Sequence, residues 1–226
     1  MFTPPTIDSK PSEQDGIETN ATASDDLISI VTCEVSTPHS EHVENAASGK
    51  FDIAILKEDI ARKGSSAEAF LKLVDEKFYD GCYTFCVIKG FVVQFGHRGD
   101  NQKANLERIP ESDKPIIESS ENDESSIVKI LRKKQNAKGT ITMISGKTGQ
   151  VFVNTGDNRR LDKDGTLPFG AIVEHKGDSR HTGMNLVESI FNEYKGGQGQ
   201  IAAVNNNQVA TKFPEMGRID RCYRKG

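Results

Sequence analysis

Short apolar runs, each ended by glycine or polar residues, recur along most of this chain and constrain its fold more than any other feature. In the first run, Val31, Cys33 and Val35 alternate with polar residues, which is the period of a half-buried strand. Further runs typical of strands lie at 51–56, 86–96, 139–144, 151–154, 168–173 and 218–223. Many short strands with few helical patterns predict a mainly β domain, a barrel with helical lids, although periodicity alone does not select one kind of barrel.

Two segments carry the apolar spacing of an amphipathic helix. The sequence Ser65-Ser66-Ala67-Glu68 fits a capping box, in which the serine and the glutamate satisfy free backbone donors at the start of a helix. One face of that helix carries Ala67, Phe70, Leu71, Val74 and Phe78. A second helix is predicted from Val187, Ile190, Phe191 and Tyr194, and Gly196-Gly197 should end it.

The remaining segments are polar and predict a tail and two enlarged loops. Residues 1–27 form an acidic segment without enough apolar surface to offset the entropy of ordering, so we expect a disordered tail. Loops are predicted at 36–50 and 97–138, and the second is an insertion that we expect to contain one short helix around 127–131.

The composition excludes several classes of protein. The 226 residues are 35% hydrophobic and carry a formal net charge of -4, whereas nucleic-acid-binding proteins are usually basic. No apolar run is long enough to span a bilayer, and the N-terminal MFTPPTIDSK lacks the succession of a signal peptide. We therefore expect a soluble protein of unknown compartment that binds no nucleic acid.

The four cysteines form neither a dense framework nor a CxxC motif, so reduced thiols are the default expectation. A bond between Cys82 and Cys86 would require a tight turn, because an extended chain separates them too far. A zinc site from Cys82, Cys86 and His97 lacks the usual ligand spacing, and nothing specifies His97 as a base for a Cys86 nucleophile. We expect no metal and no cofactor.

Several strings, in order, resemble the cyclophilin family of peptidyl-prolyl cis-trans isomerases. They are AEAFLKLVDEKFYDG (67–81), CVIKGFVVQFG (86–96), GTITM followed by GQVFVNTGDNRRLDKDGTLPFGAIVE (139–174), GMNLVESI (183–190) and KFPEMGRID (212–220). The last resembles a subgroup with a long C-terminal loop. The resemblance implies one domain over residues 28–226, a closed eight-stranded barrel capped by two α-helices, and isomerisation of X–Pro bonds without a cofactor.

The resemblance also assigns a peptide groove on the outside of the barrel. It implies an apolar pocket from Phe91, Val92, Phe152 and Leu161, with Val92 in place of a methionine. The remaining peptide-binding positions that it implies are Gln94, Gln150 and Arg160, of which Arg160 stands where cyclosporin-sensitive members carry tryptophan.

At the position of the family's catalytic arginine this sequence has Cys86. Arginine offers five fixed donors and a permanent charge, whereas a thiol is one weak donor. We therefore predict a module that binds proline-containing peptides as a monomer, with weak or absent isomerase activity. The alternatives are an active isomerase that assists folding through another arginine (Arg159, Arg160 or Arg98), and a structural subunit whose groove another protein covers.

The resemblance bears on two other cysteines as well. It makes the first and last strands neighbours, so that Cys33 and Cys222 could be close enough to form a disulfide, which would indicate an oxidising compartment. The preferred expectation is nevertheless two small buried thiols that act as apolar filler.

Overall fold

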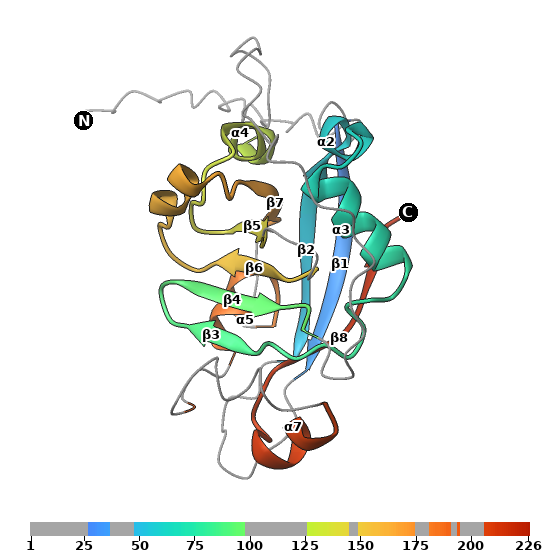
Figure 1. Cartoon of the computed structure of the whole chain (residues 1–226), viewed down its shortest axis with the longest axis vertical. Helices are drawn as coiled ribbons and strands as arrows, with labels where there is room; N and C mark the ends of the chain where they lie inside the picture. Colours follow the sequence, from blue (N-terminus) through green and yellow to red (C-terminus); the bar gives the residue numbers. More distant parts are fainter. Residues whose placement is uncertain are drawn as a thin grey trace, which may run out of the picture.

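The computed structural model describes residues 27–36, 48–97, 126–144, 149–174, 181–190, 194 and 206–226. Almost all of the predicted tail, most of the predicted loop 36–50 and much of the 97–138 insertion, including Arg98, lie outside these residues. Within the described part, the chain folds into one eight-stranded antiparallel sheet with helices around it (Figure 1).

Each predicted strand is present, and the 86–96 run divides into two. The bounds are β1 Ile28–Ser36, β2 Gly49–Leu56, β3 Cys86–Ile88, β4 Val92–Phe95, β5 Thr140–Met143, β6 Val151–Asn154, β7 Pro168–Ile172 and β8 Arg218–Arg224. The order across the sheet is β3-β4-β6-β5-β7-β2-β1-β8. Between β3 and β4 the chain reverses at Gly90, whose φ of 70° is favourable for glycine and costly for other residues.

The sheet curls into a half-barrel, so the expectation of a closed barrel is too strong. Its edge strands are β3 and β8, and no ladder joins them. The segment just before β3 approaches β8 instead: Gly81 N donates to Ile219 O at 2.7 Å, and Ile219 N donates to Cys82 O at 2.8 Å. The backbone of residues 81–84 therefore bridges the two edges in place of strand-to-strand pairing.

The main core lies on the concave side of this sheet. Every strand from β1 to β8 contributes at least one side chain to it. The strands β4 and β6, next to the β3 edge, do so through Val93, Phe95, Val151 and Val153. The helix α3 (Ser66–Asp75) contacts β5, β7 and β8. The predicted apolar face is confirmed for Ala67, Phe70, Leu71 and Val74, which all join this core. Phe78 joins it too, but from the turn after the helix, which ends at Asp75.

The start of α3 confirms the capping serine and modifies the predicted capping box. The hydroxyl of Ser65 accepts a hydrogen bond from Glu68 N at 3.0 Å. The carboxylate of Glu68 accepts from Gly64 N, one residue before the cap, rather than from Ser65. The amide of Ser65 is already used, since it donates to Arg62 O at 3.1 Å.

The second predicted helix is α5 (Gly183–Ser189), which ends earlier than predicted. Phe191 and the predicted stop at Gly196-Gly197 lie outside the described residues. The helix begins after Thr182 and ends before Ile190, whose ψ of 133° is extended. Ile190 is buried in the core, so its apolar character reflects packing after the helix and not a helical face. Apolar spacing alone could not separate these two cases.

The structure also has more helices than the two expected caps. They are α2 (Lys57–Ala61), α4 (Ser126–Lys133), α7 (Asn206–Lys212) and the 3-10 helix η1 (Arg159–Asp164). The short helix expected in the insertion is confirmed as α4, which buries Val128 and Leu131 against Ala54, Leu56 and Ala171. α4 and α7 lie at opposite ends of the molecule (Figure 1). Among the described helices, none has both the length and the apolar character to cross a bilayer.

A disulfide joins Cys33 of β1 to Cys222 of β8, so the expectation of reduced thiols is wrong for this pair. The two residues are directly opposite in the ladder, with Cα atoms 4.2 Å apart. The amide of Cys222 donates to Asp80 Oδ1, so the pair occupies a position without mutual backbone bonds, where opposed Cα atoms are closest. Cys82 and Cys86 are free and buried.

Candidate functional site

The register of β3, β4 and β6 brings the predicted groove residues to one face of the sheet. Cys86 is opposite Gln94, and Gln94 is opposite Phe152. Opposed residues of an antiparallel ladder project to the same side, and Val92 shares that side because side chains alternate along a strand. The neighbours Val93 and Val153 project into the core. The predicted residues therefore lie on the outer face, away from the core.

On this face the side chains form a second apolar cluster, which we call the edge cluster. Its members are Phe85, Cys86, Val92, Phe152, Val209 and Met216, with Tyr83, Phe91, Ile144, Leu161, Tyr194 and Phe213 packed against them. Five of the eight predicted site residues thus come together. Sequence reasoning missed Ile144, Val209 and Phe213, because single apolar residues at the end of a strand or in a polar segment give no periodic signal.

The two predicted glutamines, Gln94 and Gln150, contact each other beside the edge cluster. Gln94 Nε2 donates to Gln150 Oε1 at 3.0 Å, which joins β4 to the residue before β6. Gln94 is buried, with 6% of its surface exposed, while Gln150 is half-buried. Paired amides present both donors and acceptors, which is the chemistry needed to bind the backbone of an extended peptide.

The two arginines of η1 differ in their surroundings. Arg159 pairs with Asp157 in an exposed bidentate contact, where Nε donates to Oδ1 at 2.9 Å and to Oδ2 at 3.1 Å. These hydrogen bonds lower the pKa of Asp157 to about 2. Arg160 instead places its guanidinium carbon 4.8 Å from the centre of the Phe91 ring. The structure therefore brings Arg160, and not Arg159, to the edge cluster.

A chain of buried asparagines fixes the loops around Phe91, and sequence reasoning missed it. Asn158 Nδ2 donates to Phe91 O at 2.7 Å and to Asn154 Oδ1 at 2.8 Å. Asn154 in turn donates to Asn136 Oδ1 at 3.1 Å, and Asn136 donates to Asp162 Oδ1 at 2.7 Å. The network connects the turn that carries Phe91 to η1, which carries Arg160 and Leu161. Isolated asparagines in loops carry no sequence signal for such a network.

Cys86 is a neutral thiol in this setting. It is 4% exposed, and burial raises the pKa of the thiol above its ordinary value. Its neutral form is a weak donor and a poor nucleophile. His97 contacts Phe85, with ring centroids 5.4 Å apart. Over the described ranges, no group of three or more His, Cys, Asp and Glu side chains has the arrangement of a metal site.

Comparison with known proteins gives the family. The family model of cyclophilin type peptidyl-prolyl cis-trans isomerases matches residues 43–211, which is most of the 226 residues. The chain belongs to this family. Its fold is similar to that of a cyclophilin type peptidyl-prolyl cis-trans isomerase from Cryptosporidium parvum, with 12% identity, a TM-score of 0.49 and coverage of 88% of this chain and 98% of that one. A search of curated protein sequences gave no match.

Proposed function

We propose that residues 28–226 bind proline-containing peptides at the edge cluster and catalyse X–Pro isomerisation weakly or not at all. Family membership supports the peptide class. The edge cluster supplies an apolar surface with Phe91, Phe152 and Leu161, and the Gln94–Gln150 pair supplies polar groups beside it. Burial of a proline ring needs only this apolar surface, so binding does not depend on a catalytic donor.

The observation that carries the proposal is the buried thiol of Cys86 at the position where the resemblance implies an arginine. The X–Pro bond has a barrier of ~18–20 kcal/mol, which falls when a donor stabilises the proline nitrogen as the amide twists. A neutral thiol with a raised pKa provides no charge for this purpose. Loss of one transition-state donor costs about 10²–10³ in rate in other enzymes.

Exchange NMR on a short X–Pro peptide tests this proposal, because one sample reports binding through peak shifts and catalysis through cis–trans exchange. We expect the natural protein to shift the peaks without faster exchange, and Cys86→Arg to raise the exchange rate by about 10²–10³. Cys86→Ser is the matched control, since it changes the same atom without adding charge and should not gain rate. Faster exchange with the natural protein would contradict the proposal.

The contact between Arg160 and Phe91 favours a second candidate function, an active isomerase in which Arg160 supplies the donor. Its guanidinium already lies beside the predicted proline pocket, on a different element from Cys86. If this candidate is correct, the natural protein accelerates exchange and Arg160→Ala loses about 10²–10³ of that rate. Arg159→Ala is the control, because Arg159 is paired with Asp157 and should leave the rate unchanged. Equal rates for the two variants would exclude Arg160 as the donor.

The proposal extends to the assembly of the protein. We expect it to act as a monomer and to bind no nucleic acid, in keeping with its net charge of -4. Analytical ultracentrifugation measures the first property directly. A salt-sensitive shift on mixing with oligonucleotides would contradict the second.

A further inference from the structure

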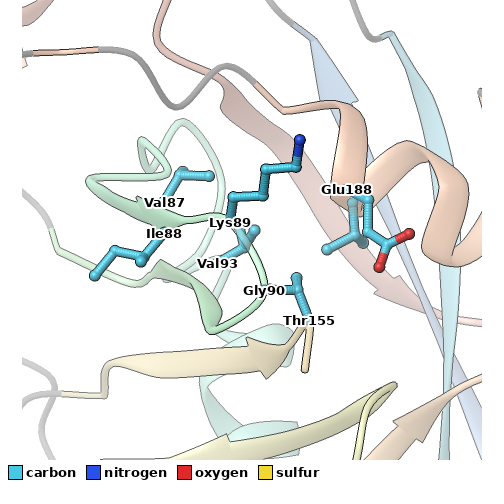
Figure 2. A pocket seen from close by; sticks show the side chains of 8 residues that line it. Val87, Ile88, Lys89, Gly90, Val93, Thr155 and Glu188 are labelled. Atoms are coloured by element: carbon cyan, nitrogen blue, oxygen red, sulfur yellow. The ribbon is translucent and has the colours of Figure 1, made fainter. Parts of the chain in front are cut away.

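A cavity of about 240 Å³ opens between the β3–β4 turn and α5, apart from the edge cluster. Its lining residues are Val87, Ile88, Lys89, Gly90, Val93, Thr155, Val187 and Glu188. None of them is among the predicted peptide-binding residues. Figure 2 shows the hairpin on one side of the cavity and Glu188 of α5 on the other.

The walls of this cavity are apolar, and its size limits the ligand. Val87 and Val93 enter it from the hairpin, and Val187 enters it from α5. Pockets for drug-sized ligands have volumes from roughly 300 Å³ upwards. This cavity is smaller, so it fits a smaller ligand group, such as one aromatic ring or one branched aliphatic group. Burial of such a group among three valines would be favourable.

Thr155 brings an unsatisfied hydroxyl to the cavity. Its side chain is 7% exposed, and its Oγ1 forms no hydrogen bond with any residue in the described part of the chain. The backbone of Thr155 is fixed, because its amide donates to Phe91 O at 2.9 Å. The oxygen is shielded from solvent, so the side chain would turn about its Cα–Cβ bond to donate into the cavity. A buried hydroxyl without a partner is costly, and a ligand acceptor would remove that cost.

The charges at the mouth of the cavity favour an anion. Lys89 is exposed and forms no ion pair with a described residue. Glu188 is already paired, because Lys138 Nζ lies 2.6 Å from its Oε1. Lys89 and Lys138 carry two positive charges and Glu188 carries one negative charge, which leaves a local excess of one positive charge. A ligand carboxylate would meet Lys89 while a ligand cation would be repelled.

We propose that this cavity binds a small apolar group that carries a carboxylate. The apolar body packs among Val87, Val93 and Val187, and the carboxylate accepts a hydrogen bond from Thr155 and pairs with Lys89. Two sources share this chemistry: a free carboxylic acid, and the C-terminal residue of a peptide with an apolar side chain. None of the lining residues belongs to the predicted proline groove, and the backbone amide by which Thr155 holds Phe91 is retained in Thr155→Val.

Titration of the nitrogen-15-labelled full chain with phenylacetate and 4-methylpentanoate tests the proposal. We expect amide shifts at Lys89, Gly90, Thr155 and Val187, and affinities for the acids about tenfold above those for phenylacetamide or phenethylamine. An acetylated peptide that ends in Leu, compared with its C-terminal amide, distinguishes the sources. If the peptide acid binds as well, the site takes a peptide C-terminus; if only the free acids bind, it takes small molecules.

Variants assign the contacts. Thr155→Val keeps the shape of the side chain and should weaken acid binding about tenfold, and Lys89→Met should abolish the preference for the acid over the amide. Glu188→Gln should strengthen acid binding, because it removes the one negative charge. Lys129→Met, on the exposed side of α4, is the control and should change nothing.

Two results would overturn the proposal. One is the absence of saturable shifts at the cavity with either acid. The other is equal binding of acid, amide and amine by the natural protein, which would leave Lys89 and Thr155 without a role. Val187→Phe, which fills the cavity, should remove binding, and Thr155→Val provides an independent check if that variant does not fold. Binding of X–Pro peptides at the edge cluster should be unchanged by Thr155→Val.

Discussion

At the scale of single residues, the chemistry of the outer face depends on which polar groups are already engaged. Gln94 and Gln150 bond to each other, Asn158 is committed to Phe91 O and Asn154, and Arg159 is held by Asp157. Arg160 is the η1 arginine that contacts an aromatic ring of the edge cluster. Within the described residues, Arg160 is therefore a candidate donor for a bound peptide, beside the glutamine amides and the weak thiol of Cys86.

The Asp157–Arg159 pair gives a pH prediction at this scale. The pKa of Asp157 is lowered to about 2 by its hydrogen bonds to Arg159, against about 3.9 for an unperturbed aspartate. A depressed folded pKa means that the contribution of the pair is present above the unfolded value and is lost as the pH falls through about 2. A carboxyl NMR titration should show this midpoint, and Arg159→Gln should return it towards 3.9. A midpoint near 4 in the natural protein would contradict the pairing.

How far the site could be predicted depends on the kind of residue. Cys86, Phe91, Val92, Phe152 and Leu161 were predicted together, since each lies in a string that resembles the family. The asparagine network was not predicted, because Asn136, Asn154 and Asn158 are separated in sequence and come into contact only in the folded chain. The peptide-binding roles of the predicted residues stay predictions until a ligand is tested.

At the scale of elements, the β3–β4 hairpin depends on a close approach of two glycines. A Cβ built on Gly156 would lie 2.0 Å from the carbonyl oxygen of Gly90. Thr155, which precedes Gly156, donates a hydrogen bond from its amide to Phe91 O. The β3–β4 turn therefore packs directly against the segment after β6. This contact determines where Phe91 stands relative to β6.

Gly156→Ala should therefore displace the hairpin turn. We expect a loss of about 1–3 kcal/mol in the free energy of unfolding, the usual range for overpacking, together with weaker binding of X–Pro peptides. Urea unfolding and the peptide titration measure the two effects. Gly226→Ala, whose Cβ would meet nothing within 4 Å, is the matched control. Unchanged stability in Gly156→Ala would show that the turn can move without cost.

Strands were easier to predict than helices, for a physical reason. A short apolar run flanked by turns is itself the signature of a strand, and the six residues of 51–56 all lie within β2. The helix α7 lies in an asparagine-rich segment with low helix propensity, and its buried Val209 joins the edge cluster. Tertiary packing overrides propensity there, which a single sequence does not reveal.

At the scale of the whole molecule, a backbone bridge connects the two edges of the half-barrel, and a disulfide reinforces the ladder between β1 and β8. The segment 81–84 bridges β3 and β8, and the Cys33–Cys222 disulfide joins β8 to β1. The bond spans a sequence separation of 189 residues. A crosslink over so long a stretch restricts the unfolded chain strongly.

Reduction of this disulfide should therefore lower the free energy of unfolding by about 2–4 kcal/mol. Urea unfolding with and without a phosphine reductant measures the difference, and intact mass confirms the loss of the bond. The Cys33→Ala/Cys222→Ala double variant should have the stability of the reduced protein and should not respond to the reductant. Identical midpoints for the oxidised and reduced natural protein would contradict the prediction.

The same bond has a consequence for a broken chain. Because it joins strands near the two ends of the domain, the backbone between Cys33 and Cys222 forms part of a covalent ring. A protease that cuts this ring once leaves a single molecule, whose two pieces remain in register until a reductant opens the sulfur link. Whether the two pieces of a cleaved domain stay together would then depend on the redox potential of the surroundings and not on the first cleavage.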